Sequence, residues 1–311
     1  MRWTDRVGRR IKLRDLHILQ AAAEAGSMAK AAAELSISQP AVSYAITEME
    51  HVLGVPLLDR TSQGVTPTAY GRALLERSII VFNELRHGIS EIEHLADPAV
   101  GDVHIGTTPP MSAIASAVIN RLIQHYPRMT FHLIVEATTT LIRELRHRNI
   151  ELVIARMVDA VTKEDLKTQI LFHDELAVIC GKHNAWARRR SSVKLSELMD
   201  EPWALYPSSS FFGLVTQSAF AAHGLDLPRV TVTTPSTYAL SMLVATGPFL
   251  TVSPRTMLRT PQKHPLLTAV AVDMRTTRDP IGLFTLGNRS LSPAAKLFKE
   301  TASVVIKALK L

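Results

Sequence analysis

Apolar and polar residues alternate with the period of an α-helix through the first fifty residues. The segment 13–25 carries one apolar face and ends at Gly26, a residue typical of helix C-termini. Ser27 and Ser38 are favourable N-caps for two further segments of the same period. The pattern therefore predicts three short helices joined by tight turns.

The third predicted helix has one apolar and one polar face. Its apolar residues recur at helical spacing and are expected to point inward: Val42, Ile46, Met49 and Leu53. Its outward residues are polar or uncharged and cluster at the helix start: Gln39, Pro40, Ser43, Tyr44 and Thr47. In a helix-turn-helix domain this part of the recognition helix reaches base edges, and Gln and Ser side chains can read them. Any small three-helix bundle is the alternative.

Two short extended segments follow, 55–61 and 64–68, and predict a two-stranded wing. Arg60 in the first segment can enter a minor groove or meet a phosphate. The wing favours DNA binding over a plain helical bundle. The expected DNA contacts are Ser38, Gln39, Pro40, Ser43, Tyr44, Thr47, Arg60, Thr61, Thr66 and Thr68.

Residues 70–96 predict one long helix with an apolar seam. The seam repeats at alternating spacings of three and four, which is typical of two helices packed together. A helix packed on its own domain is the alternative, but polar residues occupy most other positions, so dimerisation is favoured. The seam consists of Leu75, Phe82, Leu85, Ile89 and Ile92, and residues 96–101 form the expected hinge.

Strands and helices alternate beyond the hinge. Predicted strands at 103–106, 130–136 and 151–155 are separated by helices, and this βαβαβ order indicates a parallel sheet. A second unit with the same alternation spans 175–246 and ends with a helix at 237–246. The last predicted elements could return to the sheet formed by 103–155; they are strands 267–272 and 281–285 and helix 293–309.

Hydroxyl side chains dominate four strand-to-helix crossings, where open α/β sheets bind ligands. Each Ser or Thr could equally be an ordinary helix cap, but four converging helix starts would form a polar cradle suited to an anion. Arg156 directly follows an apolar strand; its guanidinium suits a carboxylate, sulfonate or phosphate, and a surface pair with Asp159 is the alternative. The expected effector contacts are Thr107, Thr108, Thr138, Thr139, Arg156, Ser208, Ser209, Ser210, Phe211, Thr234 and Tyr238.

The length and composition of the chain indicate the size and class of the protein. The chain has 311 residues, 46% of them apolar and 20% charged, which predicts a folded protein of more than one domain. Its net charge of +7 arises beyond residue 97, so charge alone does not identify the DNA-binding part. The first fourteen residues lack the apolar run of a signal peptide, and no apolar stretch is long enough to span a bilayer. We expect a cytoplasmic protein with no membrane partner.

Catalytic motifs are missing from the sequence. It contains no nucleophile elbow, Walker loop, zinc-protease helix or paired-cysteine pattern, and its 12 His are scattered. The single cysteine, Cys180, lies in an apolar strand and is expected to be a buried hydrophobe rather than a redox sensor. We expect no enzymatic activity, metal or cofactor.

The sequence resembles the LysR-type transcriptional regulators. The resemblance is carried by AAAEAGSMAKAAA (21–33), SISQPAVSYAITEMEHVLGVPLLDRT (36–61) and GVTPTAYGRALL (64–75). The chain departs from the family pattern at Tyr44 and Gln63, where basic residues are common, and this bears on operator preference. Within the family, DRTSQGVTPTAYGRALL and LADPAVGDVHIG look nearest to regulators of sugar uptake and aromatic-acid catabolism.

The resemblance implies an α/β protein with an all-α N-terminal part. The implied parts are a winged helix-turn-helix DNA-binding domain at 11–68 (helix-turn-helix 28–47), a linker and dimerisation helix at 69–97, and a two-lobed, periplasmic-binding-protein-like effector domain at 98–311. Lobe I would comprise 98–162 and 268–311, and lobe II 163–267.

The resemblance also implies the partners. These are double-stranded operator DNA, a second copy of the chain bound through an antiparallel linker helix, a homotetramer, and RNA polymerase if the protein activates. A small effector, expected to be an organic anion, would bind in the interlobe cleft. The alternative is a solute-binding or small-molecule enzyme domain whose helical N-terminus only dimerises. The polar face of the third helix and the wing disfavour it.

Overall fold

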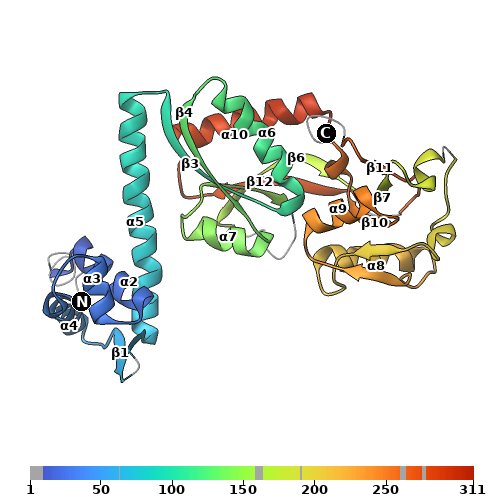
Figure 1. Ribbon diagram of the computed structural model, residues 1–311. Helices are drawn as coiled ribbons and strands as arrows, with labels where there is room; N and C mark the ends of the chain where they lie inside the picture. The colour runs from blue at the N-terminus through green and yellow to red at the C-terminus, as the bar shows by residue number, and fades with distance from the viewer. Residues whose placement is uncertain (1–9, 63, 158–163, 190, 260–263, 275–277) are drawn as a thin grey trace. The chain divides into compact units, whose positions relative to one another are not determined.

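The computed structural model forms two compact units. It describes residues 10–62, 64–157, 164–189, 191–259, 264–274 and 278–311. The first unit extends to Ile89 and includes His147–Asn149, and the second comprises the remainder (Figure 1). Gln63 and Asp159, both named in the sequence analysis, lie outside the described residues.

The first unit contains the three predicted helices and the wing. Ser27 and Ser38 accept hydrogen bonds from the backbone N–H groups of Lys30 and Ala41, so both serines cap helices as expected. The predicted inward side of the third helix is buried, except that Leu53 at its end is only half-buried. The elements are α2 (Leu13–Ala25), α3 (Met28–Glu34), α4 (Gln39–Leu53), β1 (Leu58–Thr61), β2 (Gly64–Pro67) and the start of α5 (Ala69–Ala96).

Backbone contacts fix the wing beside the helices. The strands β1 and β2 are antiparallel, and Val65 N–H donates to the carbonyl of Gly26 at 2.9 Å. Glu50 Oε1 accepts from the backbone N–H of Leu57 at 2.7 Å. A Cβ on Gly71 would lie 2.0 Å from the Leu57 carbonyl oxygen, so α5 approaches this loop more closely than any other residue type allows. These contacts hold the wing at the end of α2, and the loop before it against α4 and α5.

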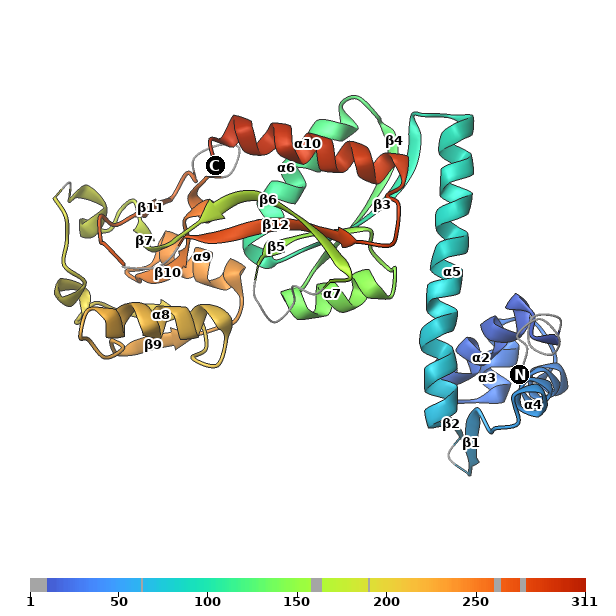
Figure 2. The ribbon, with the colours of Figure 1, turned by 180° about the vertical axis from the view of Figure 1, so that it is seen from behind.

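A five-stranded sheet organises the first lobe of the second unit. The strand order is β4-β3-β5-β12-β6; β3 is parallel to β4 and β5 as predicted, whereas β12 is antiparallel to β5 and β6. Two helices, α6 and α10, cover one face, and α7 covers the other (Figures 1 and 2). The elements are β3 (Val100–Thr107), a 3₁₀ turn (Pro109–Met111), α6 (Ser112–Ile123), β4 (Arg128–Val135), α7 (Thr138–Arg146), β5 (Leu152–Arg156), β6 (Leu166–Asp174), β12 (Asp279–Leu286) and α10 (Pro293–Leu309).

The second lobe has a three-stranded sheet of order β10-β7-β11 and a parallel pair, β8 and β9. Trp203 and Phe220 are fully buried in its core and meet edge to face at 5.6 Å. The elements are β7 (Leu176–Gly181), β8 (Trp203–Leu205), α8 (Phe211–Ala222), β9 (Val230–Thr233), α9 (Thr237–Thr246), β10 (Thr251–Pro254), β11 (Leu267–Ala269) and 3₁₀ turns at Ala185–Arg188, Leu195–Leu198 and Arg255–Leu258.

Strand pairing corrects the expected lobe boundaries. The strand β6 falls within the range expected for lobe II, 163–267, but it pairs with β12 in the five-stranded sheet. Conversely, β11 was expected to return to lobe I, but it pairs with β7 in the second lobe. The chain therefore enters the second lobe between Asp174 and Leu176 and leaves it between β11 and β12. These pairings join distant segments, which local patterning does not reveal.

The hinge after α5 is shorter than predicted. The helix ends at Ala96 and β3 begins at Val100, so the strand starts within the expected hinge of 96–101. Asp97 closes this turn, because its Oδ1 accepts from the backbone N–H of Ala99 at 3.0 Å. This hydrogen bond lowers the pKa of Asp97.

Candidate functional site

The outward face of α4 is solvent-exposed and uncharged. Gln39, Pro40, Tyr44 and Thr47 are exposed, and Ser43 is half-buried. Ser38 is also exposed, but its hydroxyl caps the helix. These positions follow from the packing of the opposite side of α4 into the core of the first unit. We call Gln39, Pro40, Ser43, Tyr44 and Thr47 the α4 face.

Arg60 lies across this face. Its Nη1 donates to Ser43 Oγ at 3.4 Å, and its Nη2 donates to Thr47 Oγ1 at 3.3 Å. Both acceptors are neutral hydroxyls, and Arg60 is exposed. The wing thus brings one positive charge to the otherwise uncharged α4 face. Such a surface can contact both a phosphate and base edges.

The remaining predicted DNA contacts divide between exposed and structural residues. Thr61 and Thr66 are exposed on the wing. The hydroxyl of Thr68 donates to the Pro56 carbonyl at 2.7 Å and accepts from the N–H of Gly71 at 3.0 Å. Thr68 therefore holds the start of α5, and its contact with DNA stays a prediction.

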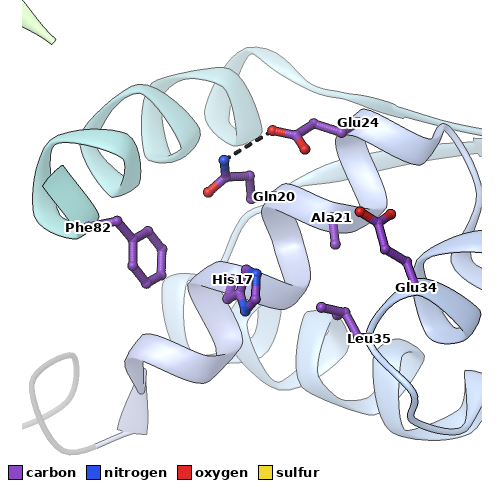
Figure 3. Close-up of a pocket in the computed structure, with 7 residues that line it drawn as sticks. All are labelled: His17, Gln20, Ala21, Glu24, Glu34, Leu35 and Phe82. Carbon is purple, nitrogen blue, oxygen red and sulfur yellow. Dashed lines mark hydrogen bonds between the residues drawn. The ribbon is translucent and has the colours of Figure 1, made fainter. Parts of the chain in front are cut away.

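An acidic pocket of about 260 Å³ lies where α5 packs on α2 and α3 (Figure 3). Gln20 donates a hydrogen bond to Glu24 at 3.0 Å, and the ring of Phe82 meets His17 edge-on at 5.9 Å. The carboxylates disfavour an approach of the DNA backbone here. The lining residues are His17, Gln20, Ala21, Glu24, Glu34, Leu35 and Phe82.

The predicted seam of α5 is divided between two roles. Leu75 packs against the core of its own unit, and Phe82 packs against His17. Part of the predicted seam therefore packs within its own unit, and the contact of the seam with a second copy stays a prediction. Beyond the first turn of α5, its exposed large apolar residues are Val81, Leu85, Ile89, Ile92 and Leu95, which we call the α5 stripe. The prediction missed both Val81, which directly precedes Phe82 of the seam, and Leu95, which lies three residues beyond its last member, Ile92.

The first lobe brings several predicted effector residues to one edge of its sheet. Thr107, Thr138 and Arg156 lie at the C-terminal ends of the neighbouring strands β3, β4 and β5 or shortly after them. Thr107 is fully buried and its hydroxyl donates to the Ile154 carbonyl at 3.2 Å, so this side chain secures the sheet. Thr108 is half-buried and Thr139 is exposed.

In the second lobe, several of the predicted hydroxyls cap helices or turns. Ser210 accepts from the N–H of Gly213 at 3.1 Å at the start of α8, while Ser208 and Ser209 are exposed. Thr234 accepts from the N–H of Ser236 at 3.2 Å, and Tyr238 is exposed. The alternative interpretation of Ser210 as an ordinary helix cap is therefore confirmed.

Sequence reasoning missed a buried group of hydroxyls between these turns. The hydroxyl of Tyr206 lies 3.0 Å from Thr237 Oγ1. Burial raises the pKa of Tyr206, and the hydroxyls of Thr237 and Ser253 partly oppose this. Tyr206 directly follows the strand β8, and that position was the available signal.

Arg156 is buried and ion-paired. Only 6% of the residue is exposed; its Nη1 donates to Asp279 Oδ2 at 2.7 Å, and its Nη2 lies 3.9 Å from Asp174 Oδ2. Burial raises the pKa of Asp174, although hydrogen bonds and the Arg156 charge partly oppose it. Arg156 thus has two acidic partners that the sequence did not indicate.

Two donors of Arg156 remain unused. Within the described part of the chain, Nε and Nη2 have no hydrogen-bond acceptor. The guanidinium carbon lies 5.8 Å from the ring centroid of Phe211, at the start of α8. Arg156 therefore joins the sheet edge of the first lobe to a helix start of the second.

Comparison with protein families gives two matches that together cover most of the chain. Residues 13–72 match the bacterial regulatory helix-turn-helix proteins of the lysR family, and residues 96–303 match the LysR substrate binding domain. The HTH-type transcriptional regulator GbpR of Rhizobium radiobacter is 30% identical over 237 residues, 74% of this chain and 76% of that protein. GbpR of Azospirillum brasilense is 28% identical over 288 residues, 92% and 84% of the two chains.

Solved structures share the fold. CbnR in complex with its target DNA superposes with a TM-score of 0.69 at 20% identity, covering 94% of this chain and 99% of that chain. A full-length OxyR variant from Pseudomonas aeruginosa gives a TM-score of 0.63 at 18% identity, covering 95% and 94%. No helix in the described ranges is long and apolar enough to cross a membrane.

Proposed function

Because the chain belongs to the LysR family of DNA-binding transcriptional regulators and carries an effector-binding domain, we propose that the α4 face and Arg60 read operator DNA and that Arg156 binds a small organic anion between the lobes. The curated relatives are regulators of transcription rather than enzymes. The observation that carries the effector proposal is the pair of unused Arg156 donors in a buried position.

The DNA-reading proposal is supported by the chemistry of the α4 face. Gln39 is exposed near the helix start, where an amide side chain can pair with an adenine edge. Arg60 is anchored by hydroxyls of α4, so its charge is held next to the base-reading side chains. Phosphate contacts position a protein on DNA, and base contacts specify the sequence.

We expect Gln39→Ala to relax operator preference while the protein stays folded, because the side chain is exposed. One good base contact contributes about 1–3 kcal/mol of discrimination. Fluorescence anisotropy with the chain's own upstream DNA and single-base variants of it measures this. Arg60→Ala is the matched comparison. It should weaken binding to all DNA sequences alike and flatten the salt dependence of that binding. Unchanged base discrimination in Gln39→Ala would remove Gln39 from the reading surface.

The effector proposal rests on directional hydrogen bonding. Asp279 and Asp174 already compensate the charge of Arg156, so net positive charge does not attract the ligand. The unused Nε and Nη2 donors instead require acceptor oxygens, which a carboxylate supplies with good geometry. The start of α8 beside Phe211 adds partial positive charge from its free N–H groups. An organic carboxylate satisfies both the unused Arg156 donors and the N–H groups at the start of α8.

We expect Arg156→Lys to weaken effector binding about 10–100-fold, because Lys keeps the ion pair with Asp279 but loses the planar donor pair, and a hydrogen bond to a charged group contributes about 1.5–3 kcal/mol. A thermal-shift screen of organic acids and sugar acids, each paired with its neutral amide, identifies the ligand, and calorimetry measures affinity. DNA binding without ligand should stay at the parent level.

Arg278→Lys is the matched control, since this guanidinium is exposed and pairs with Glu175 at the surface. It should bind the ligand like the parent protein. A neutral or cationic effector, or parent-like titration by Arg156→Lys, contradicts the anion site.

A further inference from the structure

A carboxylate and two imidazoles meet on neighbouring strands of the first lobe. His104 on β3 and His132 on β4 stand opposite each other in the parallel register, and Asp102 lies two residues before His104 on the same face. Asp102 Oδ2 is 3.0 Å from His104 Nε2, and Asp102 Oδ1 is 3.0 Å from His132 Nε2. We propose that these three residues bind a divalent transition-metal ion of the zinc class.

The donor atoms have suitable chemistry and spacing. One ligand atom from each residue can be chosen so that all three lie within 4.8 Å of one another. Bonds of about 2.0–2.2 Å at tetrahedral angles place ligand atoms about 3.3 Å apart, close to the observed carboxylate–imidazole distances. Two imidazoles and one carboxylate favour Zn²⁺, Co²⁺, Ni²⁺ or Cu²⁺ over Mg²⁺ or Ca²⁺, which prefer oxygen ligands.

One ligand atom has an imidazole nearby but forms no hydrogen bond among the described residues. Asp102 Oδ1 is buried and, among the described residues, has no hydrogen bond despite the nearby His132 ring. The two imidazole rings are stacked at 4.3 Å with an interplanar angle of 15°. Their in-plane lone pairs therefore lie in two separate, nearly parallel planes, and convergence on one ion requires a ring to turn. His132 is on the edge strand with half its side chain exposed, so it has room to turn.

The site is open and separate from Arg156. Three protein ligands leave at least one coordination position, which water can fill because Asp102 and His132 are partly exposed. Thr107 marks the end of β3 nearest Arg156 and lies five residues beyond Asp102, roughly 16 Å along an extended strand. Loss of metal binding and loss of effector binding are therefore distinguishable.

The test uses the full-length protein after chelator treatment and removal of the chelator. Calorimetric titration with ZnCl₂ should give one ion per chain, and CoCl₂ should produce the visible absorption of tetrahedral Co²⁺. His132→Ala and Asp102→Asn should each weaken Zn²⁺ binding at least about 100-fold, since even changes to residues that only hydrogen-bond to the ligands lower metal affinity about 10–100-fold. Asp102→Asn preserves the shape of the side chain, and His132 is at the surface, so both variants should remain folded.

His125→Ala is the matched control. His125 is exposed on the turn after α6, and its Nδ1 meets only the Arg121 carbonyl, at 3.1 Å, in the described structure. This variant should bind Zn²⁺ and Co²⁺ like the parent protein. The proposal is overturned if the parent binds no stoichiometric ion, or if His132→Ala and Asp102→Asn retain the parent affinity.

Discussion

Replacing Leu85 and Ile89 together by Asp should convert the protein to monomers and abolish operator binding. Both residues lie in the α5 stripe, where 48% and 51% of each residue are exposed. A continuous apolar stripe in water indicates a missing partner surface. Burial of one such side chain contributes about 1.5–3 kcal/mol, and a two-fold dimer contains each substitution twice. The double change should thus remove at least about 6 kcal/mol of association free energy.

Sedimentation velocity measures the oligomeric state, and anisotropy on the same samples measures operator binding. Ser90→Asp is the matched control, because it introduces the same side chain on the same helix away from the α5 stripe. It should leave the assembly intact. A dimeric Leu85→Asp, Ile89→Asp variant would place the main subunit contact in the effector domain.

Arg156→Ala should destabilise the effector domain by about 3 kcal/mol. Removing one partner of a buried ion pair leaves an uncompensated charge and costs about 3–5 kcal/mol; we take the lower end because Asp279 is partly exposed. Asp174, in contrast, is almost fully buried. A weak effector response in Arg156→Ala would therefore mix lost stability with lost ligand contacts, which is why Arg156→Lys serves for the binding test.

The stability deficit should depend on pH with a definite sign. Burial raises the pKa of Asp174 in the folded protein, so the folded state holds its proton more tightly than the unfolded state does. Loss of the Arg156 charge raises this pKa further. The deficit of Arg156→Ala should be largest above the folded pKa of Asp174 and shrink as the pH falls through it.

Urea unfolding of the parent and of Arg156→Ala at neutral and mildly acidic pH measures both the loss of stability and its dependence on pH. Arg278→Ala is the matched control, because it removes an exposed guanidinium paired at the surface and should change stability little at either pH. A pH-independent deficit in Arg156→Ala would exclude Asp174 as its source. Parent-like stability would show that the buried ion pair contributes nothing.

Local chemistry in the sequence determined the positions of the helices and the polar α4 face. Ser27 and Ser38 cap the helices that their positions predicted, because an N-cap hydroxyl acts within three residues of itself. The inward residues of α4 are buried because a helix with one apolar side can pack in only one rotation. Helices α9 and α10 begin and end where the pattern predicted.

Only the tertiary structure decided which distant segments meet. Strand β6 pairs with β12, although its own pattern is compatible with either lobe. Leu75 packs on the core of its own unit, and its pattern did not indicate this, since periodicity defines an apolar side of a helix but not the surface that covers it. Arg156 finds Asp279 across 123 residues, and His104 meets His132 through strand register. Each of these contacts depends on long-range chain closure, which leaves no periodic signal in the residues that make it.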